Sequence, residues 1–133
     1  MSTPIRVLIL DDHPAVRAGL EQLLRAAQDI DVVALTADIR TAAAVVEAAS
    51  VNVAVVDLSM PGTEGVEATR RLLGRDPRLR VVVLTAFADR DRLDRARDVG
   101  ATRCVTKDAE PEELIGAIRA AAGRPPLEAV ALD

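Results

Sequence analysis

The sequence predicts an α/β fold in which helices cover both faces of a parallel sheet. Five short apolar runs alternate along the chain with five segments whose apolar residues recur at helical spacing. The runs are almost continuously apolar, which is typical of strands buried on both faces. The 133 residues, 50% of them hydrophobic, are enough for one domain with its own core.

The first half of the chain supplies three strands and two helices. The apolar run 5–10 predicts a strand, and Pro14 then suits the first position of a helix over 14–27 because proline has no N–H to lose there. Strands are expected over 31–36 and 52–56. Between them the apolar side chains of segment 40–49 share one face, which predicts a helix.

The second half continues the alternation. We expect helices over 65–73, 90–99 and 111–122 and strands over 80–84 and 102–106. Gly74, Gly100 and Gly123 follow the three helices, where glycine commonly ends a helix.

Five such units in one domain fit few topologies, since crossovers between parallel strands are right-handed. The expected architecture is a flavodoxin-like (βα)5 doubly wound sheet with strand order 2-1-3-4-5. Residues 1–123 form the predicted domain. Residues 124–133 open with Pro125-Pro126 and are expected to be a C-terminal tail or the start of a linker.

Composition excludes several classes of function. The net charge is −4 and Phe87 is the only aromatic residue, so direct nucleic-acid binding by this chain is not expected. Cys104 is the only cysteine, which rules out an internal disulfide and favours a reducing compartment. The sequence has no apolar stretch of transmembrane length, and a cytoplasmic protein without membrane contact is expected.

Polar residues stand where four of the predicted strands end. Asp11 and Asp12 follow the first strand, Asp57 ends the third, Thr85 ends the fourth, and Lys107 follows the fifth. The carboxyl ends of parallel strands share one edge of the sheet, where ligands bind in open α/β folds. We therefore expect these five side chains to converge.

Three carboxylates at one place repel one another, and a divalent cation such as Mg²⁺ relieves that repulsion. One carboxylate can then act as a nucleophile towards a phosphoryl group, while an ammonium and a hydroxyl contact the phosphoryl oxygens. Lys107 is the only lysine among 17 Lys and Arg residues, which also favours a specific role. The set fits phosphoryl transfer to an aspartate.

Each residue also has a simpler interpretation. Asp11 or Asp12 can cap the next helix, Asp57 can form a turn, Thr85 can be an ordinary strand residue, and Lys107 can be a solvated charge. Their coincidence at one edge favours the functional interpretation.

Two further residues are interpreted conservatively. We expect His13 to be a loop residue beside the site, not a metal ligand or a phosphate carrier. Cys104 is expected to be a small core residue and not a reactive thiol.

Four segments together resemble a known family. They are LILDDHPAVRAGLEQLL (8–24), VVDLSMPGTEGVEATRRL (55–72), VLTA (83–86) and GATRCVTKD (100–108). Together they resemble the receiver domains of bacterial two-component response regulators. The residues of these segments are most similar to the NarL/FixJ-type subfamily. The resemblance extends from residue 5 to about residue 122.

The resemblance implies a role for each site residue. Asp57 is the implied phosphoacceptor, Asp12 a direct Mg²⁺ ligand, and Asp11 a ligand through water. Further ligand oxygens come from Asp57 and the main-chain carbonyl of Ser59. Lys107 is the implied cation on the phosphoryl oxygens.

The resemblance also implies how the switch works. Thr85 is the implied switch hydroxyl, and a sensor histidine kinase is the implied phosphodonor. Phosphorylation then shifts the face formed by helix 90–99, strand 102–106 and helix 111–122. The domain takes part in its own phosphorylation and dephosphorylation and is not a turnover enzyme.

Some positions depart from or extend the family pattern. Cys104 stands where Tyr or Phe is common, which puts the usual aromatic switch in doubt, and Glu64 replaces a frequent Asp. Pro61 and Gly65 match the loop after the acceptor. Phe87 can screen water from a phosphoaspartate, so we expect slow self-hydrolysis.

Alternatives stay open at this point. One interpretation is the receiver of a transcription regulator whose DNA-binding domain is absent. The other is a stand-alone receiver that acts through a protein partner. An aspartyl-phosphate phosphohydrolase is disfavoured because Ser59 stands where a second Asp is needed. A receiver used only for binding is the third rival. The charged helix 90–99 is expected to be solvated, with a homodimer surface as the alternative.

Overall fold

The computed structural model describes residues 3–60, 64–86 and 89–123, which form a five-stranded parallel sheet in the order β2-β1-β3-β4-β5. The strands are β1 (Ile5–Leu10), β2 (Ile30–Thr36), β3 (Val53–Asp57), β4 (Arg80–Thr85) and β5 (Arg103–Thr106). The helices are α1 (Pro14–Arg25), α2 (Ile39–Ala48), α3 (Glu64–Arg75), α4 (Arg90–Asp98) and α5 (Pro111–Ala121). The predicted fold class and strand order are confirmed.

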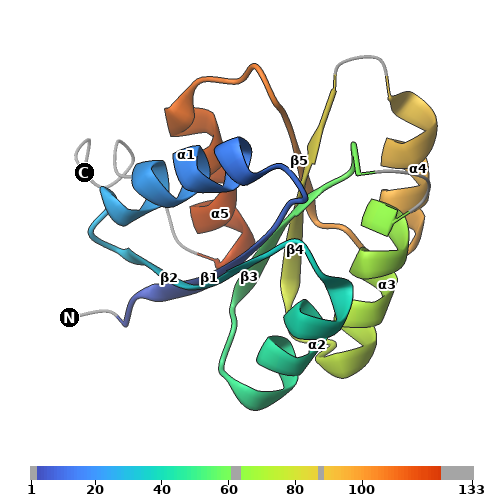
Figure 1. The fold of residues 1–133 in the computed structure, drawn as a ribbon, viewed down its shortest axis with the longest axis horizontal. Coiled ribbons are helices and arrows are strands. Elements are labelled where there is room, and N and C mark those ends of the chain that lie inside the picture. The colour runs from blue at the N-terminus through green and yellow to red at the C-terminus, as the bar shows by residue number, and fades with distance from the viewer. Residues whose placement is uncertain (1–2, 61–63, 87–88, 124–133) are drawn as a thin grey trace.

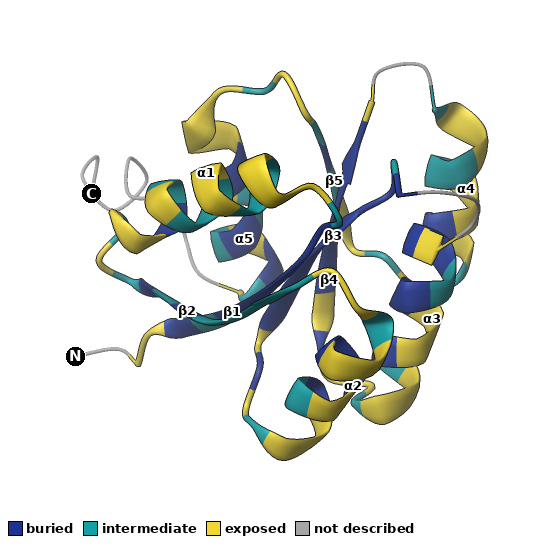
Figure 2. Ribbon diagram, viewed as in Figure 1, coloured by how far each residue is buried: buried dark blue, intermediate teal, exposed yellow. Residues whose placement is uncertain are grey.

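Helices cover both faces of the sheet. Figure 1 shows α1 and α5 on one side and α2, α3 and α4 on the other. Successive side chains of a strand point to opposite faces. In β1, Ile5, Val7 and Ile9 therefore join the core under α1 and α5, while Leu8 and Leu10 join the core under the other three helices. Figure 2 shows the buried sheet between helices whose outer faces are exposed.

Element boundaries differ from the prediction at two places that matter. The helix expected over 14–27 ends at Arg25, because the chain then turns, with the N–H of Ala27 bonded to the carbonyl of Leu24 at 3.1 Å. The third strand extends to Asp57, which pairs with Leu84 of β4. The backbone of Asp57 is therefore held within the sheet.

The end of α4 requires glycine. Gly100 has a φ of 115°, in the region that only glycine adopts readily. Its N–H bonds the carbonyl of Arg97 and the N–H of Ala101 bonds the carbonyl of Ala96, the pattern of a Schellman motif. This turn directs the chain from α4 into β5.

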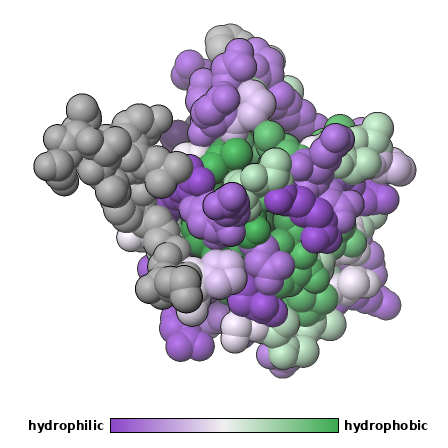
Figure 3. All heavy atoms as spheres, turned by 90° about the vertical axis from the view of Figure 1, so that its left-hand side faces the viewer, coloured by the Kyte–Doolittle hydropathy of each residue, from purple (hydrophilic) through white to green (hydrophobic). Residues whose placement is uncertain are grey.

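The face of the molecule drawn in Figure 3 carries both hydrophilic and hydrophobic residues. Within the described residues, no helix has both the length and the apolarity to cross a membrane. The tail predicted over 124–133 lies outside the described residues.

Candidate functional site

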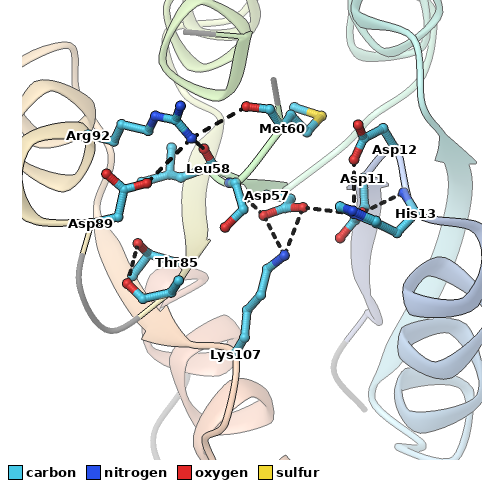
Figure 4. A network of polar contacts seen from close by, with 12 residues as sticks. Asp11, Asp12, His13, Asp57, Leu58, Met60, Thr85, Asp89, Arg92 and Lys107 are labelled. Atoms are coloured by element: carbon cyan, nitrogen blue, oxygen red, sulfur yellow. Dashed lines mark hydrogen bonds and ion pairs between the residues drawn. The ribbon is translucent and has the colours of Figure 1, made fainter. Parts of the chain in front are cut away.

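The polar side chains at the carboxyl ends of β1, β3 and β5 meet around Asp57 (Figure 4). Asp57 is 0% exposed and Asp11 is 1% exposed, so both carboxylates are removed from bulk water. Asp12 is half-buried beside them. Lys107 approaches from the turn after β5. The predicted convergence of these four side chains is observed.

Lys107 is the direct counter-ion of Asp57. Its Nζ lies 3.0 Å from each carboxylate oxygen of Asp57, across 50 residues of sequence. The Lys107 side chain is 30% exposed, so it is only partly removed from solvent. A buried carboxylate needs such a partner, because burial without one disfavours the charged form.

Asp11, Asp12 and Asp57 enclose a small space into which His13 also points. Nδ1 of His13 lies 3.1 Å from Asp11 Oδ1, 2.9 Å from Asp12 Oδ1 and 3.6 Å from Asp57 Oδ2. One ligand atom from each of the four residues falls within 4.8 Å of all the others. His13 is thus a loop residue beside the site, as expected, with its Nδ1 directed at the carboxylates.

The electrostatics of this cluster suit a cation. Burial raises the pKa of Asp11, and the nearby Asp57 carboxylate raises it further, while the hydrogen bond from the main-chain N–H of His13 opposes both. Asp11 Oδ2 is buried and has no hydrogen-bond partner among the described residues. Carboxylate oxygens are the preferred ligands of hard divalent ions. These residues therefore fit a Mg²⁺-type ion.

Thr85 and Ser59 adjoin the cluster but make other contacts in this structure. The Thr85 hydroxyl donates to the carbonyl of Ala86 at 3.1 Å, so it is turned away from Asp57 (Figure 4). The main-chain N–H of Ser59 donates to Asp57 Oδ1 at 2.8 Å. That bond helps to fix the orientation of the Asp57 carboxylate.

Gly65 lets α3 approach the end of β3. A Cβ on Gly65 would lie 2.8 Å from the carbonyl oxygen of Asp57 and 2.8 Å from Cα of Leu58. Only a residue without a side chain fits there. Glu64 is exposed at the start of α3, while Pro61 and Phe87 lie outside the described residues.

Cys104 lies half-buried in β5 and packs against the core under α2, α3 and α4. Burial raises the pKa of its thiol. It is therefore a small packing residue with little thiolate at neutral pH, as expected.

Two arginines of the site were not predicted. Arg17 of α1 donates to the main-chain carbonyl of Asp11 at 2.6 Å. Arg92 of α4 donates to the main-chain carbonyls of Leu58 at 3.0 Å and Met60 at 3.5 Å. Each arginine lies on a partly buried side of its helix, where the packing of the helix lets its guanidinium reach a main-chain carbonyl.

The remaining charges of α4 are exposed, as the sequence predicted for a solvated face. They are Arg90, Asp91, Asp94, Arg95, Arg97 and Asp98.

Comparison with known proteins shows the family of this chain. Residues 7–119 match the model of the response regulator receiver domain. The chain belongs to the response regulator receiver family. The transcriptional regulatory protein LiaR of Bacillus subtilis (strain 168) is 37% identical over 125 residues, which are 93% of this chain and 59% of LiaR. The DNA-binding transcriptional activator DevR/DosR of Mycobacterium tuberculosis is 38% identical over 115 residues, 86% of this chain and 53% of that protein.

Solved receivers have the same architecture. A LuxR-family response regulator from Aurantimonas sp. SI85-9A1 is 36% identical with a TM-score of 0.82, covering 92% of this chain and 88% of that chain. The signal receiver domain of the putative regulator NarL of Mycobacterium tuberculosis is 26% identical with a TM-score of 0.83, covering 92% and 98%. The predicted NarL/FixJ-type relationship is confirmed. This receiver domain spans somewhat more than half the length of the curated relatives.

Proposed function

We propose that this receiver domain accepts a phosphoryl group on Asp57 from a sensor histidine kinase, in a reaction that needs Mg²⁺. The observation that carries the proposal is the position of Asp57. Its carboxylate is completely buried between the Lys107 ammonium and the Asp11–Asp12–His13 cluster. A buried, charge-compensated carboxylate at the carboxyl edge of a parallel sheet is well placed as a nucleophile.

Asp11, Asp12, Asp57 and the main-chain carbonyl of Ser59 are the proposed holders of Mg²⁺. The orphaned Oδ2 of Asp11 and the mutual repulsion of the three carboxylates support this assignment. When bound, the ion offsets negative charge on the carboxylates and on the phosphoryl oxygens.

In the proposed transfer, a carboxylate oxygen of Asp57 bonds to phosphorus while the bond from phosphorus to the kinase imidazole nitrogen breaks. The electron pair of that bond stays on the nitrogen. A carboxylate nucleophile needs no base to activate it, and the Lys107 ammonium contacts Asp57 at 3.0 Å. Lys107 then contacts a phosphoryl oxygen, which offsets the charge gained on transfer.

Thr85 is the proposed link from the phosphoryl group to the rest of the molecule. Its hydroxyl now bonds the neighbouring carbonyl of Ala86, and a rotation of the side chain would exchange that acceptor for a phosphoryl oxygen. Phosphorylation thereby favours a second arrangement of the face formed by α4, β5 and α5.

The output is proposed to be transcriptional. LiaR and DevR/DosR are named as transcription regulators, and this receiver spans somewhat more than half of each. We therefore propose that the receiver controls a DNA-binding output domain. A stand-alone receiver acting through a protein partner is the alternative, and a homodimer of receivers is compatible with either. We propose a cytoplasmic location for the protein in either case.

Intact-mass analysis after incubation with acetyl phosphate and Mg²⁺ tests the function. The expected result is a gain of one phosphoryl group, lost without Mg²⁺ and in Asp57→Asn. Steady release of phosphate from simple esters would instead support the phosphohydrolase. The absence of any mass gain, with no binding of beryllofluoride, would indicate a receiver used only for binding.

A further inference from the structure

The three residues after Asp57, here called the acceptor loop (58–60), are held at both ends of their backbone. The N–H of Leu58 bonds the carbonyl of Leu84 in β4 at 2.8 Å, and the N–H of Ser59 bonds Asp57 Oδ1 at 2.8 Å. The carbonyls of Leu58 and Met60 accept from one nitrogen, Nη1 of Arg92. Leu58 and Met60 are completely buried, so their carbonyls need a hydrogen-bond donor from the protein.

Arg92 reaches the acceptor loop from a different layer of the fold. It lies near the start of α4, 34 residues from Leu58 in sequence, and Figure 4 shows its guanidinium directed at the loop. Its side chain is 30% exposed, and Asp89 at the start of the same helix pairs with it at 3.4 Å. The guanidinium is thus held between α4 and the loop.

The position of Ser59 gives this contact a consequence for the site. Ser59 lies between the two carbonyls that Arg92 binds, and its own carbonyl is the proposed main-chain ligand of Mg²⁺. The orientation of that carbonyl depends on the peptide groups on either side of it, since each peptide group is planar. Groups that orient metal ligands from outside the coordination shell commonly change metal affinity by 10–100-fold.

We propose that Arg92 is a positioning residue that couples α4 to the acceptor loop and so sets the Mg²⁺ affinity of the receiver. This inference rests on the proposed function for the identity of the metal ligands. The coupling acts in both directions. A shift of the first turn of α4 either moves the two loop carbonyls or breaks their hydrogen bonds.

The test compares Arg92→Gln with Arg92→Lys, which keeps the charge but not the planar group. Calorimetric titration with Mg²⁺ is expected to show about tenfold weaker binding for Arg92→Gln and an intermediate loss for Arg92→Lys. In metal-free protein, amide hydrogen exchange of Ser59 is expected to be several-fold faster in Arg92→Gln. The exchange of Val55, in the centre of β3, is expected to be unchanged.

Arg95→Gln is the matched control, because Arg95 is an exposed arginine of the same helix. It is expected to leave both the Mg²⁺ affinity and the exchange of Ser59 unchanged. The proposal is overturned if Arg92→Gln matches this control. It is also overturned if the exchange of Val55 rises as much as that of Ser59, since the effect is then a general loss of stability.

Failure of the proposed function gives a different result. A wild-type protein that takes up no Mg²⁺ contradicts the assignment of the metal site. In that case the exchange of Ser59 and Val55 in metal-free protein still decides whether Arg92 holds the loop.

Discussion

At the scale of single residues, Asp11 is an electrostatically unfavourable member of the site. It is buried, it faces Asp57, and its pKa is raised by both. A raised pKa in the folded state means that this group stabilises the fold most at pH values below its ordinary pKa of 3.8. That contribution is lost as the pH rises through the folded-state pKa, because the carboxylate that then forms is buried beside Asp57.

Asp11→Asn is therefore expected to stabilise the metal-free receiver at pH 7, by about 1 kcal/mol or about 4 °C in Tm. The amide oxygen can still accept the hydrogen bond from the N–H of His13. Thermal unfolding in EDTA measures the gain, and added Mg²⁺ should stabilise the wild type more than the variant. A lower Tm for Asp11→Asn at pH 7 in EDTA would show that repulsion is not the dominant effect of this residue.

The sequence was informative for those site residues that end strands. Asp57, Asp11 and Lys107 could be predicted to converge because parallel strands bring their carboxyl ends to one edge. The contacts of Arg92 and Arg17 with the site could not be predicted from the sequence, because the reach of a guanidinium depends on how the helices pack. The orientation of the Thr85 hydroxyl likewise depends on a local choice between acceptors.

At the scale of elements, α3 is placed by the close approach of Gly65 to the end of β3. A Cβ there would contact backbone atoms of Asp57 and Leu58, which cannot move without disturbing the sheet. Gly65→Ala is expected to destabilise the fold by about 1–3 kcal/mol, although alanine favours helix by about 1 kcal/mol. Urea unfolding measures the difference.

Gly74 offers a control within the same helix. A Cβ on Gly74 would contact nothing within 4 Å, so Gly74→Ala is expected to be neutral or to stabilise the protein by up to about 1 kcal/mol. Equal effects of the two substitutions would mean that the approach of α3 to β3 does not constrain the fold.

The start of α2 provides a prediction about pH. Asp38 caps this helix by accepting from the N–H of Arg40 at 3.2 Å and from the hydroxyl of Thr41 at 3.0 Å. These hydrogen bonds lower the pKa of Asp38, so its contribution is present above its ordinary pKa and is lost as the pH falls through the folded-state pKa.

Asp38→Ala is expected to lower Tm at pH 7, and the difference from wild type should shrink as the pH falls below about 4. Asp38→Asn, which keeps a capping oxygen, should lower Tm at pH 7 by less than Asp38→Ala does. Thermal scans at pH 7, 4 and 3 measure this. A deficit that stays constant over this range would mean that the charge of Asp38 does not contribute.

At the scale of the whole molecule, the fold was predictable because the central strands β1, β3 and β4 are buried on both faces and alternate along the chain with amphipathic helices. The exact ends of α1 and β3 could not be predicted, because turns and strand pairing determine where these elements end. Long-range side-chain contacts could not be predicted from the sequence either. Arg119 of α5 donates two hydrogen bonds to Asp29, at 2.7 and 2.8 Å, across 90 residues of sequence.

The sheet brings together residues from three distant parts of the chain, and the account depends on Asp57 as the residue that is modified. Tryptic digestion separates the candidates, because Asp11, Asp12 and His13 fall in the peptide 7–17 and Asp57 in the peptide 41–70. Borohydride reduces an aspartyl phosphate to homoserine and leaves a free carboxylate unchanged.

The most direct measurement is peptide mapping after incubation with acetyl phosphate and Mg²⁺ followed by borohydride reduction. We predict homoserine at position 57 in the peptide 41–70, and none without Mg²⁺. Reduction at position 11 or 12, or a phosphoryl group retained on His13, would contradict the assignment of Asp57 as the phosphoacceptor.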